Sequence, residues 1–236
     1  MCLATALGVL VPGAATDAEP GRRCDTCRVP TSPISAVAFD LGGVLIDWDP
    51  RHLYRQLFAD PADMEDFLRR ICTADWHRAH DLGADIARSC EQLARQYPGY
   101  REMIMAWALR GEEMAAGQID GTVEVLRELI AAGLPCYALS NMEPETFAVR
   151  RERFAFMSWF SDHVISGIEQ VAKPDPAIFE ILLRRNGLRP QSVIFVDDQP
   201  ANVRAACDVG LTTIRFVSPE QLRRDMRAHG LPVAAP

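Results

Sequence analysis

The sequence predicts an α/β fold in which a parallel β-sheet carries helices on both faces and a small all-helical segment is inserted after the first strand. Three observations predict it. An apolar strand pattern lies at residues 35–41, purely helical patterns fill residues 51–115, and strand and helix patterns alternate from residue 119 onward. Strands separated by helices of about ten residues indicate βαβ units, and therefore a parallel sheet.

The first ordered element is the strand at 35–41, and the chain changes character after Asp49-Pro50. Leu53, Leu57 and Phe58 then follow one another at helical spacing, and Pro61 is typical of a helix start. Further amphipathic patterns cover 61–71, 86–97 and 103–114. We therefore expect residues 51–115 to form an all-helical cap.

Beyond the cap, each apolar run is followed by one amphipathic stretch. The predicted strands are 135–139, 162–166, 193–196 and 212–216, and the predicted helices are 122–132, 143–154, 176–185, 200–209 and 219–228. Together with residues 34–50, the segment 116–236 is expected to form a Rossmann-like core.

The first 33 residues are rich in Pro, Gly, Ala and Thr, and we expect them to be a disordered extension. Met1–Ala15 is apolar but lacks the positive start of a signal peptide. Cys24 and Cys27 form a CxxC without a second pair or a histidine at zinc spacing, so we interpret them as two thiols in a flexible tail.

Composition limits the location and the partners of the protein. The net charge is −7, so nothing supports a nucleic-acid partner, and no apolar run reaches the roughly 18–20 residues that a membrane span needs. Seven cysteines, an odd number, are typical of reduced thiols. We expect a cytoplasmic protein.

Polar side chains follow four successive strand patterns of the predicted core. Because carboxyl ends of parallel strands share one edge of a sheet, these side chains can converge on one crevice. They are Asp40 after the first strand, Ser140 and Asn141 after the second, Lys173 a few residues after the third, and Asp197 and Asp198 at the end of the fourth.

These residue types suit one chemistry. Carboxylates gathered at one strand edge repel each other and favour a divalent ion with oxygen ligands, most naturally Mg²⁺. Lys173 would offset the negative charge of the nucleophile and of a phosphoryl group, and Ser140 and Asn141 can donate hydrogen bonds to it. Each motif alone is common in unrelated loops, but the four in succession predict a phosphoryl-transfer site with an aspartyl nucleophile.

At this point the chain resembles the haloacid dehalogenase-like (HAD) hydrolases, over residues 35–230, and in particular their subgroup with a small helical cap. Trp76-His77-Arg78, with Asp81 and Gly83, resembles a cap segment of the sugar-phosphatase-like branch. The four family motifs are matched by Phe39–Leu45, Leu139–Asn141, Lys173–Pro176, and Val196–Asp198 with Asn202.

The resemblance implies a role for each of these residues. Asp40 would form an aspartyl-phosphate, Lys173 would steady it, and Ser140 and Asn141 would bind the transferring group. Asn202 would orient the acidic loop. The Mg²⁺ ligands would be Asp40, Asp197, Asp198 and the backbone carbonyl of Gly42. The expected activity is Mg²⁺-dependent hydrolysis of a small phosphomonoester, by analogy a sugar phosphate, by a monomer or a homodimer.

One position departs from the family pattern. Most phosphatases of the family have a second Asp two residues after the nucleophile, as general acid and base, and here that residue is Gly42. General acid–base help is typically worth about 10²–10⁴-fold in rate. Asp47 and Asp49, which follow the first motif, and His77 in the cap are the substitutes that the sequence offers.

Two other functions stay open at this stage. A 2-haloacid dehalogenase would use the same Asp40 nucleophile without a second Asp, but that branch resembles a metal-free site, and the acidic pair Asp197-Asp198 favours a phosphatase. A non-catalytic relative that binds a phospho-ligand is the third possibility. The sequence does not identify the substrate.

Overall fold

The computed structural model describes residues 33–235, so all but the last residue of the predicted extension, with Cys24 and Cys27, lies outside the described part. A five-stranded sheet with the order β5-β4-β1-β6-β7 forms the centre, and every pair of neighbours is parallel. The strands are β1 (Ala36–Phe39), β4 (Cys136–Ser140), β5 (Asp162–Ile165), β6 (Val193–Asp197) and β7 (Thr212–Arg215). The predicted α/β fold is confirmed.

Strand β1 lies in the middle of the sheet and all four of its residues are fully buried. A strand covered on both faces is apolar throughout rather than alternating, as Ala-Val-Ala-Phe is here. Phe39 pairs with Ala138 on one side and with Val196 on the other. The next backbone N–H, that of Asp40, donates to the carbonyl of Val196 at 2.9 Å. The carboxyl ends of β1, β4 and β6 are therefore level.

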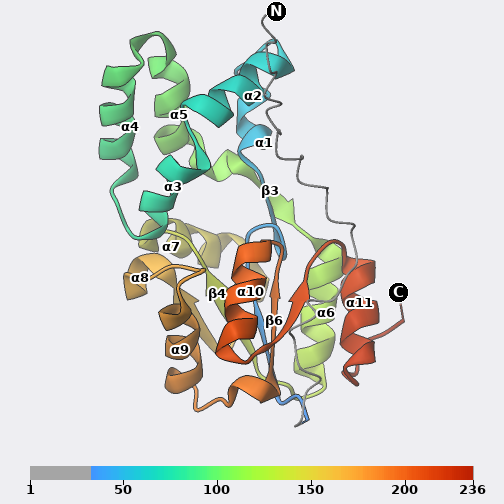
Figure 1. Ribbon diagram of the computed structural model, residues 1–236. Helices are drawn as coiled ribbons and strands as arrows, with labels where there is room; N and C mark the ends of the chain where they lie inside the picture. The colour runs from blue at the N-terminus through green and yellow to red at the C-terminus, as the bar shows by residue number, and fades with distance from the viewer. Residues whose placement is uncertain (1–32, 236) are drawn as a thin grey trace, which may run out of the picture.

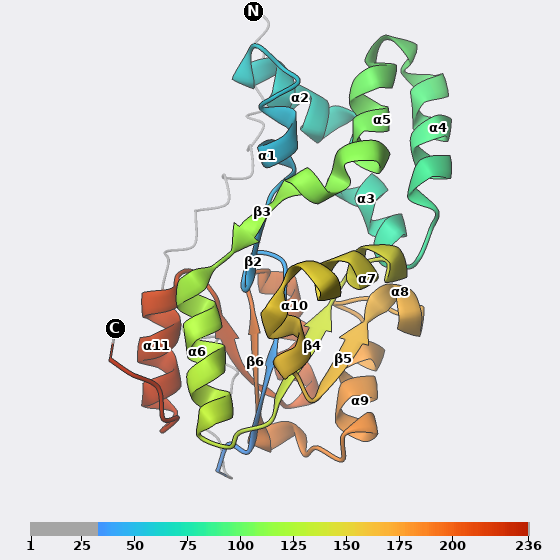
Figure 2. The same cartoon turned by 180° about the vertical axis from the view of Figure 1, so that it is seen from behind.

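Helices cover both faces of this sheet (Figures 1 and 2). One apolar cluster joins a face of the sheet to α6, α7 and α11, and a second joins the other face to α9 and α10. Four of the five helices carry Pro at the first or second helical position, where its missing N–H costs nothing. Their bounds are α6 (Asp120–Ala131), α7 (Pro144–Arg153), α9 (Pro176–Arg185), α10 (Pro200–Val209) and α11 (Pro219–Ala228).

The helical insertion lies beyond the carboxyl ends of the strands (Figure 1). It has an apolar cluster of its own, which includes Tyr54, Phe67 and Trp107. This separate cluster supports our proposal that residues 51–115 are a cap domain and that 34–50 and 116–236 form the core. The elements are α1 (Pro50–Tyr54), α2 (Pro61–Arg70), α3 (Ala74–Asp81), α4 (Ile86–Gln96), α5 (Arg101–Arg110) and the 3₁₀ turns η1 (Pro98–Tyr100) and η2 (Gly111–Met114).

Some short elements escaped sequence analysis. An antiparallel pair, β2 (Ile46–Trp48) and β3 (Ala115–Gln118), carries the chain from the core to the insertion and back. Both strands are too short and too mixed in polarity to give an alternating signal. Within the predicted all-helical segment, α3 and η1 had no pattern of their own. Outside it, the unpredicted elements are α8 (Ser166–Glu169), η3 (Ala155–Trp159) and η4 (Pro190–Ser192).

Cys72, Cys90 and Cys136 are buried free thiols in the described residues, and Cys207 is a half-buried one. Burial raises the pKa of Cys136 to about 12, which leaves it protonated and unreactive at neutral pH. Among residues 33–235, no helix has the length and apolar character to cross a membrane.

We predict that Phe179→Ala destabilises the core by about 3–5 kcal/mol, because it leaves a cavity against a fully buried face of the sheet. Phe179 has no exposed surface and its ring meets that of Phe195 edge-on, with 5.3 Å between centroids. Urea unfolding measures the change. Val149→Ala, at a side chain that is 46% exposed, is the control and should stay within about 0.5 kcal/mol of wild type.

Candidate active site

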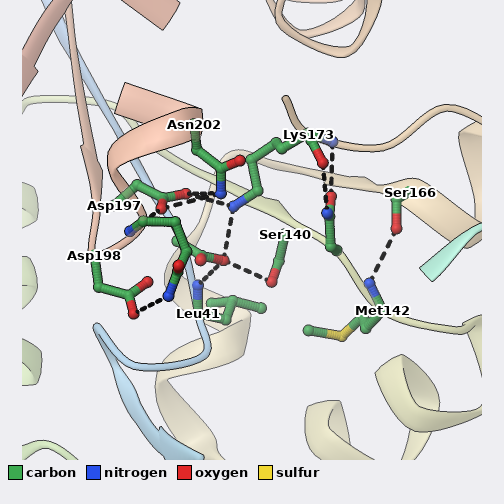
Figure 3. Close-up of polar contacts among 11 residues, drawn as sticks. Leu41, Ser140, Met142, Ser166, Lys173, Asp197, Asp198 and Asn202 are labelled. Carbon is green, nitrogen blue, oxygen red and sulfur yellow. Dashed lines mark hydrogen bonds and ion pairs between the residues drawn. The ribbon is translucent and has the colours of Figure 1, made fainter. Parts of the chain in front are cut away.

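The carboxylate of Asp40 is held at the end of β1 by donors from three parts of the chain. Its Oδ1 accepts hydrogen bonds from the backbone N–H of Leu41 at 2.7 Å and from the Ser140 hydroxyl at 2.8 Å. The ammonium of Lys173 lies 3.0 Å from the same oxygen. Ser140 comes from β4 and Lys173 from the loop before α9, and Figure 3 shows both directed into one site. With Oδ1 engaged three times, Oδ2 is the oxygen that can meet a cation or a substrate.

Lys173 is the cation at the centre of the site. Its side chain is fully buried, and its Nζ lies 2.7 Å from Oδ2 of Asp197 as well as 3.0 Å from Asp40. Burial alone would lower the pKa of Lys173, but the two carboxylates outweigh it and hold that pKa above its ordinary value. The ammonium therefore stays charged at neutral pH.

The acidic pair at the end of β6 has two different environments. Asp197 is fully buried and accepts hydrogen bonds from the Asn202 amide, at 3.1 and 3.0 Å on its two oxygens, and from the N–H of Gln199 at 2.8 Å. Asp198 is half-buried and accepts a hydrogen bond from the Gln199 side chain at 2.6 Å. Asn202 thus fixes Asp197, while Asp198 keeps more access to solvent.

Asn141 fixes the loop that carries Lys173. Its amide nitrogen donates to the Lys173 carbonyl and its amide oxygen accepts from the Lys173 N–H, both at 2.9 Å. Both polar atoms of the side chain are engaged in this reciprocal pair. The structure therefore gives Asn141 a positioning role, and its contact with the transferring group stays a prediction.

Three carboxylates can share one cation here. Asp40, Asp197 and Asp198 each offer an oxygen within 4.8 Å of the others. Burial, with the charge of Asp197, raises the pKa of Asp40 to about 7 against the opposing effect of Lys173. The pKa of Asp198 is raised by the same two causes. Because one ammonium does not balance three carboxylates, the donor set fits a hard divalent cation such as Mg²⁺.

The glycines after Asp40 meet different constraints. Gly43 has φ of +74°, and a Cβ there would lie 2.9 Å from Oδ2 of Asp198, so this position requires glycine. At Gly42 the nearest atom to an added Cβ is the Cβ of Trp48, at an ordinary 3.8 Å. A side chain would therefore fit at Gly42, and steric exclusion does not explain the missing acid.

Two of the sequence-predicted substitutes for that acid are engaged elsewhere. Asp47 is exposed and pairs with the Nε2 of His52 at 3.0 Å. Asp49 caps α1, where it accepts a hydrogen bond from the N–H of Arg51 at 2.8 Å. The structure does not bring either carboxylate into the hydrogen-bonded group around Asp40.

His77, the third substitute, lies on α3 at the boundary between the insertion and the core. Its ring stacks on that of Trp48, with 5.4 Å between centroids, and its Nδ1 is 3.4 Å from the Nδ1 of His80. Burial lowers the pKa of His77 to about 4, so the ring is neutral at pH 7. A neutral imidazole is a poor acid, which weakens the case for His77 as proton donor.

Sequence analysis missed Ser166, which joins the insertion to the core. Its hydroxyl donates to the backbone carbonyl of Asp81 at the end of α3. It also accepts a hydrogen bond from the N–H of Met142 at 3.0 Å, and Figure 3 draws this second bond. It directly follows the last pairing residue of β5, Ile165, much as Ser140 ends β4, and this polar residue at a strand end was the available signal. Asp81 is itself largely buried, and burial, with the charge of Glu143, raises its pKa to about 7.

Comparison with known sequences identifies a family. A model of the haloacid dehalogenase-like hydrolases matches residues 34–210. Acyl-CoA dehydrogenase family member 10 of Mus musculus is 26% identical over 211 residues, which are 82% of this chain and 19% of that protein. Flavin mononucleotide hydrolase 1 of Arabidopsis thaliana is 28% identical over 50% of this chain and 48% of its own. A sesquiterpene phosphatase of Aspergillus oryzae is 28% identical over 77% and 89%. The chain thus spans about a fifth and about half of the first two relatives.

Solved structures share the fold. A predicted HAD-like family hydrolase from Porphyromonas gingivalis superposes with a TM-score of 0.64 at 22% identity, over 84% of this chain and 98% of that one. A HAD family enzyme from Bacteroides thetaiotaomicron, in complex with magnesium and inorganic phosphate, gives 0.61 at 21% identity over 78% and 95%. L-2-haloacid dehalogenase from Xanthobacter autotrophicus gives 0.57 at 21% identity over 85% of each chain.

The raised pKa of Asp40 predicts a pH-dependent stability of the metal-free protein. An ordinary Asp ionises near pH 4 in the unfolded chain, whereas Asp40 has a pKa of about 7 in the folded protein. Between these values the folded state binds more protons, so stability falls as pH rises. Asp40→Asn mimics the protonated form and should lack this fall. Its advantage over wild type should grow by on the order of 2 kcal/mol between pH 5 and 7.5.

Urea unfolding in EDTA measures this difference. Asp60→Asn is the matched control, because Asp60 is an exposed N-cap of α2 and Asn caps equally well. If the free energies of unfolding of wild type and Asp40→Asn change with pH in the same way, Asp40 is not the group whose ionisation lowers stability.

Proposed function

The chain belongs to the haloacid dehalogenase-like hydrolases, and we propose that it is a Mg²⁺-dependent phosphatase that hydrolyses a small phosphomonoester through an aspartyl-phosphate. One observation carries this proposal. The Asp40 carboxylate is fixed by three donors on a single oxygen, one of them the buried ammonium of Lys173, and it lies beside a pair of carboxylates. A fixed nucleophile next to a cation site is what phosphoryl transfer requires.

The reaction would proceed in two displacements. A carboxylate oxygen of Asp40 forms a bond to phosphorus while the bond from phosphorus to the leaving oxygen breaks. Water then hydrolyses the aspartyl-phosphate, which releases inorganic phosphate and restores the carboxylate. Lys173, 3.0 Å from Asp40, and Ser140, 2.8 Å from it, hold the nucleophile in place through both steps. The ammonium also offsets the charge of the phosphoryl oxygens.

Mg²⁺ would be held by Asp40, Asp197 and Asp198 with the backbone carbonyl of Gly42. When bound, it supplies positive charge to the phosphoryl group and to the crowded carboxylates. The fit rests on three oxygen donors within 4.8 Å of one another. Because Asp197 already accepts from Lys173, Asn202 and Gln199, we assign it to positioning as well as to charge.

The comparisons support this choice of reaction. One sequence relative is named a sesquiterpene phosphatase, another a flavin mononucleotide hydrolase, and a neighbour of the same fold holds magnesium and inorganic phosphate. A small phosphate ester, for which a sugar phosphate is the family analogy, is accordingly the substrate class that we propose.

Gly42 shapes the expected specificity. Without a carboxylate at this position, and with Asp47 and Asp49 engaged elsewhere, departure of the leaving oxygen receives no evident proton from the loop after β1. Such an enzyme should favour esters whose leaving group departs as a stable anion. Slow turnover of alkyl phosphates follows from the same reasoning.

A 2-haloacid dehalogenase is the second candidate. It is favoured by Gly42, since displacement of halide by Asp40 needs no general acid, and by a dehalogenase among the structures of the same fold. The acidic cluster argues against it, because three carboxylates around one ammonium repel each other and this repulsion is left uncompensated in a metal-free site. A non-catalytic phospho-ligand-binding protein would keep the anion site without turnover.

We predict that wild type hydrolyses p-nitrophenyl phosphate in Mg²⁺ and that EDTA abolishes this turnover. Asp40→Asn should lower kcat to the background rate, because an amide is not a nucleophile. Release of p-nitrophenolate at 405 nm measures both effects. Far-UV circular dichroism confirms that the variant is folded.

The alternatives give different results in the same preparations. Chloride released from 2-chloropropionate in EDTA, with no phosphatase activity, would replace the proposal by a dehalogenase. Saturable binding of inorganic phosphate without turnover of any phosphate ester would indicate the non-catalytic relative.

We also predict that Gly42→Asp creates a proton donor. The backbone at Gly42 is outside the left-handed region, and an added Cβ has room. Hydrolysis of phenyl phosphate should rise at least about tenfold, below the full 10²–10⁴ that a well-placed general acid contributes. Turnover of p-nitrophenyl phosphate should change less, because its leaving group needs no proton.

Gly42→Asn is the matched control, since it has the same shape and hydrogen-bonding capacity but cannot transfer the proton. Equal rates for Gly42→Asp and Gly42→Asn on phenyl phosphate would contradict a missing general acid at this position.

A further inference from the structure

We propose that His77, His80 and Glu143 form a second divalent-cation site, of the class that binds Zn²⁺, at the boundary between the helical insertion and the core. Each of the three residues offers a ligand atom within 4.8 Å of the other two. His77 and His80 belong to α3 of the insertion, and Glu143 immediately precedes α7 of the core. This site is separate from the group formed by Asp40, Asp197 and Asp198, which share no residue with it.

The two histidines have the geometry of metal ligands. They are three residues apart on α3, so their side chains leave the same face of the helix. Their Nδ1 atoms are 3.4 Å apart. Two nitrogens at about 2.0–2.1 Å from a tetrahedral zinc ion are separated by about 3.3 Å, so little movement is needed.

Two buried polar atoms in this cluster have no hydrogen-bond partner among residues 33–235. The Nε2 of His80 and the Oε1 of Glu143 form no hydrogen bond there, although the two residues are only 0% and 5% exposed. Leaving such atoms unpaired in the interior is costly, above all for a carboxylate. A cation bound by the two Nδ1 atoms and by Glu143 would remove this cost at the carboxylate.

The two imidazoles lie in a largely buried setting. His80 has no exposed surface and the His77 side chain is 23% exposed, and neutral imidazole is the form that binds metal. Asp81 lies on the far side of His77, with its Oδ1 3.8 Å from Nε2. A carboxylate behind a ligating histidine is the usual outer partner in zinc sites.

The donor atoms decide the class of metal. Two imidazoles and one carboxylate are typical ligands of zinc, whereas Mg²⁺ prefers oxygen donors alone, as at Asp40, Asp197 and Asp198. Three protein ligands leave a fourth position for water or for a group of the substrate. The donor sets therefore favour Mg²⁺ at the carboxylate group and Zn²⁺ at the group with two imidazoles.

The site would join the insertion to the core. Ser166 already links the carbonyl of Asp81 to the N–H of Met142, one residue from Glu143. A metal bound to the histidines of α3 and to Glu143 would add a second connection between α3 and the core. Binding should accordingly hold the insertion against the edge of the sheet that carries Asp40.

The experiment measures Zn²⁺ binding by the full chain in a large excess of Mg²⁺, which fills the oxygen site. After removal of metals with a chelator, isothermal titration calorimetry and equilibrium dialysis should show one tightly bound Zn²⁺ per chain. Co²⁺ in its place should give visible d–d absorption of a four-coordinate site with nitrogen ligands. His80→Gln and, separately, Glu143→Gln should weaken Zn²⁺ binding by more than about 100-fold, because loss of even an outer-shell partner costs 10–100-fold.

Matched variants identify the site. His52→Gln removes an imidazole outside the cluster, Asp198→Asn alters the oxygen site, and Cys24→Ser with Cys27→Ser removes the CxxC thiols. All three should bind Zn²⁺ as wild type does. Absence of Zn²⁺ binding by wild type, or equal binding by wild type and both cluster variants, would overturn the proposal. Because each readout is binding, the result does not depend on phosphatase activity.

Discussion

The candidate active site depends on one buried ammonium, that of Lys173. It lies within 3.0 Å of carboxylate oxygens of both Asp40 and Asp197, with no exposed surface of its own. Burying one charge is costly unless it is paired, and here one cation serves two anions from two strands. Asn141 fixes the Lys173 backbone and Asn202 fixes Asp197, so both amide side chains hold charged residues in place. Removing Lys173 would leave two buried carboxylates that repel each other.

The single ammonium of Lys173 does not neutralise all the carboxylates of the site, and this excess of negative charge bears on function. The third carboxylate, Asp198, faces the same space, and the pKa values of Asp40 and Asp198 are both raised by burial. Folding brings these carboxylates together, and without a cation they repel one another. A bound cation would relieve this repulsion, so the site favours cation binding. The same repulsion supports our proposal of phosphate ester hydrolysis over a metal-free displacement.

The boundary between the insertion and the core carries a second group of polar residues. The hydroxyl of Ser166 links α3 to the segment after β4 through two hydrogen bonds. Near this link lies the group formed by His77, His80 and Glu143. The two histidines are far from Glu143 in sequence. Two buried side-chain atoms of the group, the Nε2 of His80 and the Oε1 of Glu143, have no hydrogen-bond partner among the described residues. These atoms support the cation site that we propose there, which would join α3 to the segment between β4 and α7.

The sequence by itself determined the parallel α/β fold and the convergence of Asp40, Ser140, Lys173 and Asp197, because strand and helix periodicity fix which residues end each strand, and parallel strands end at one edge. Only the tertiary structure decided that Asn141 positions Lys173, that Asp47 and Asp49 are engaged elsewhere, and that His80 meets Glu143. These contacts join segments separated by a whole insertion or by several strands. No local pattern encodes such distances, because they depend on how the helices pack against the edge of the sheet.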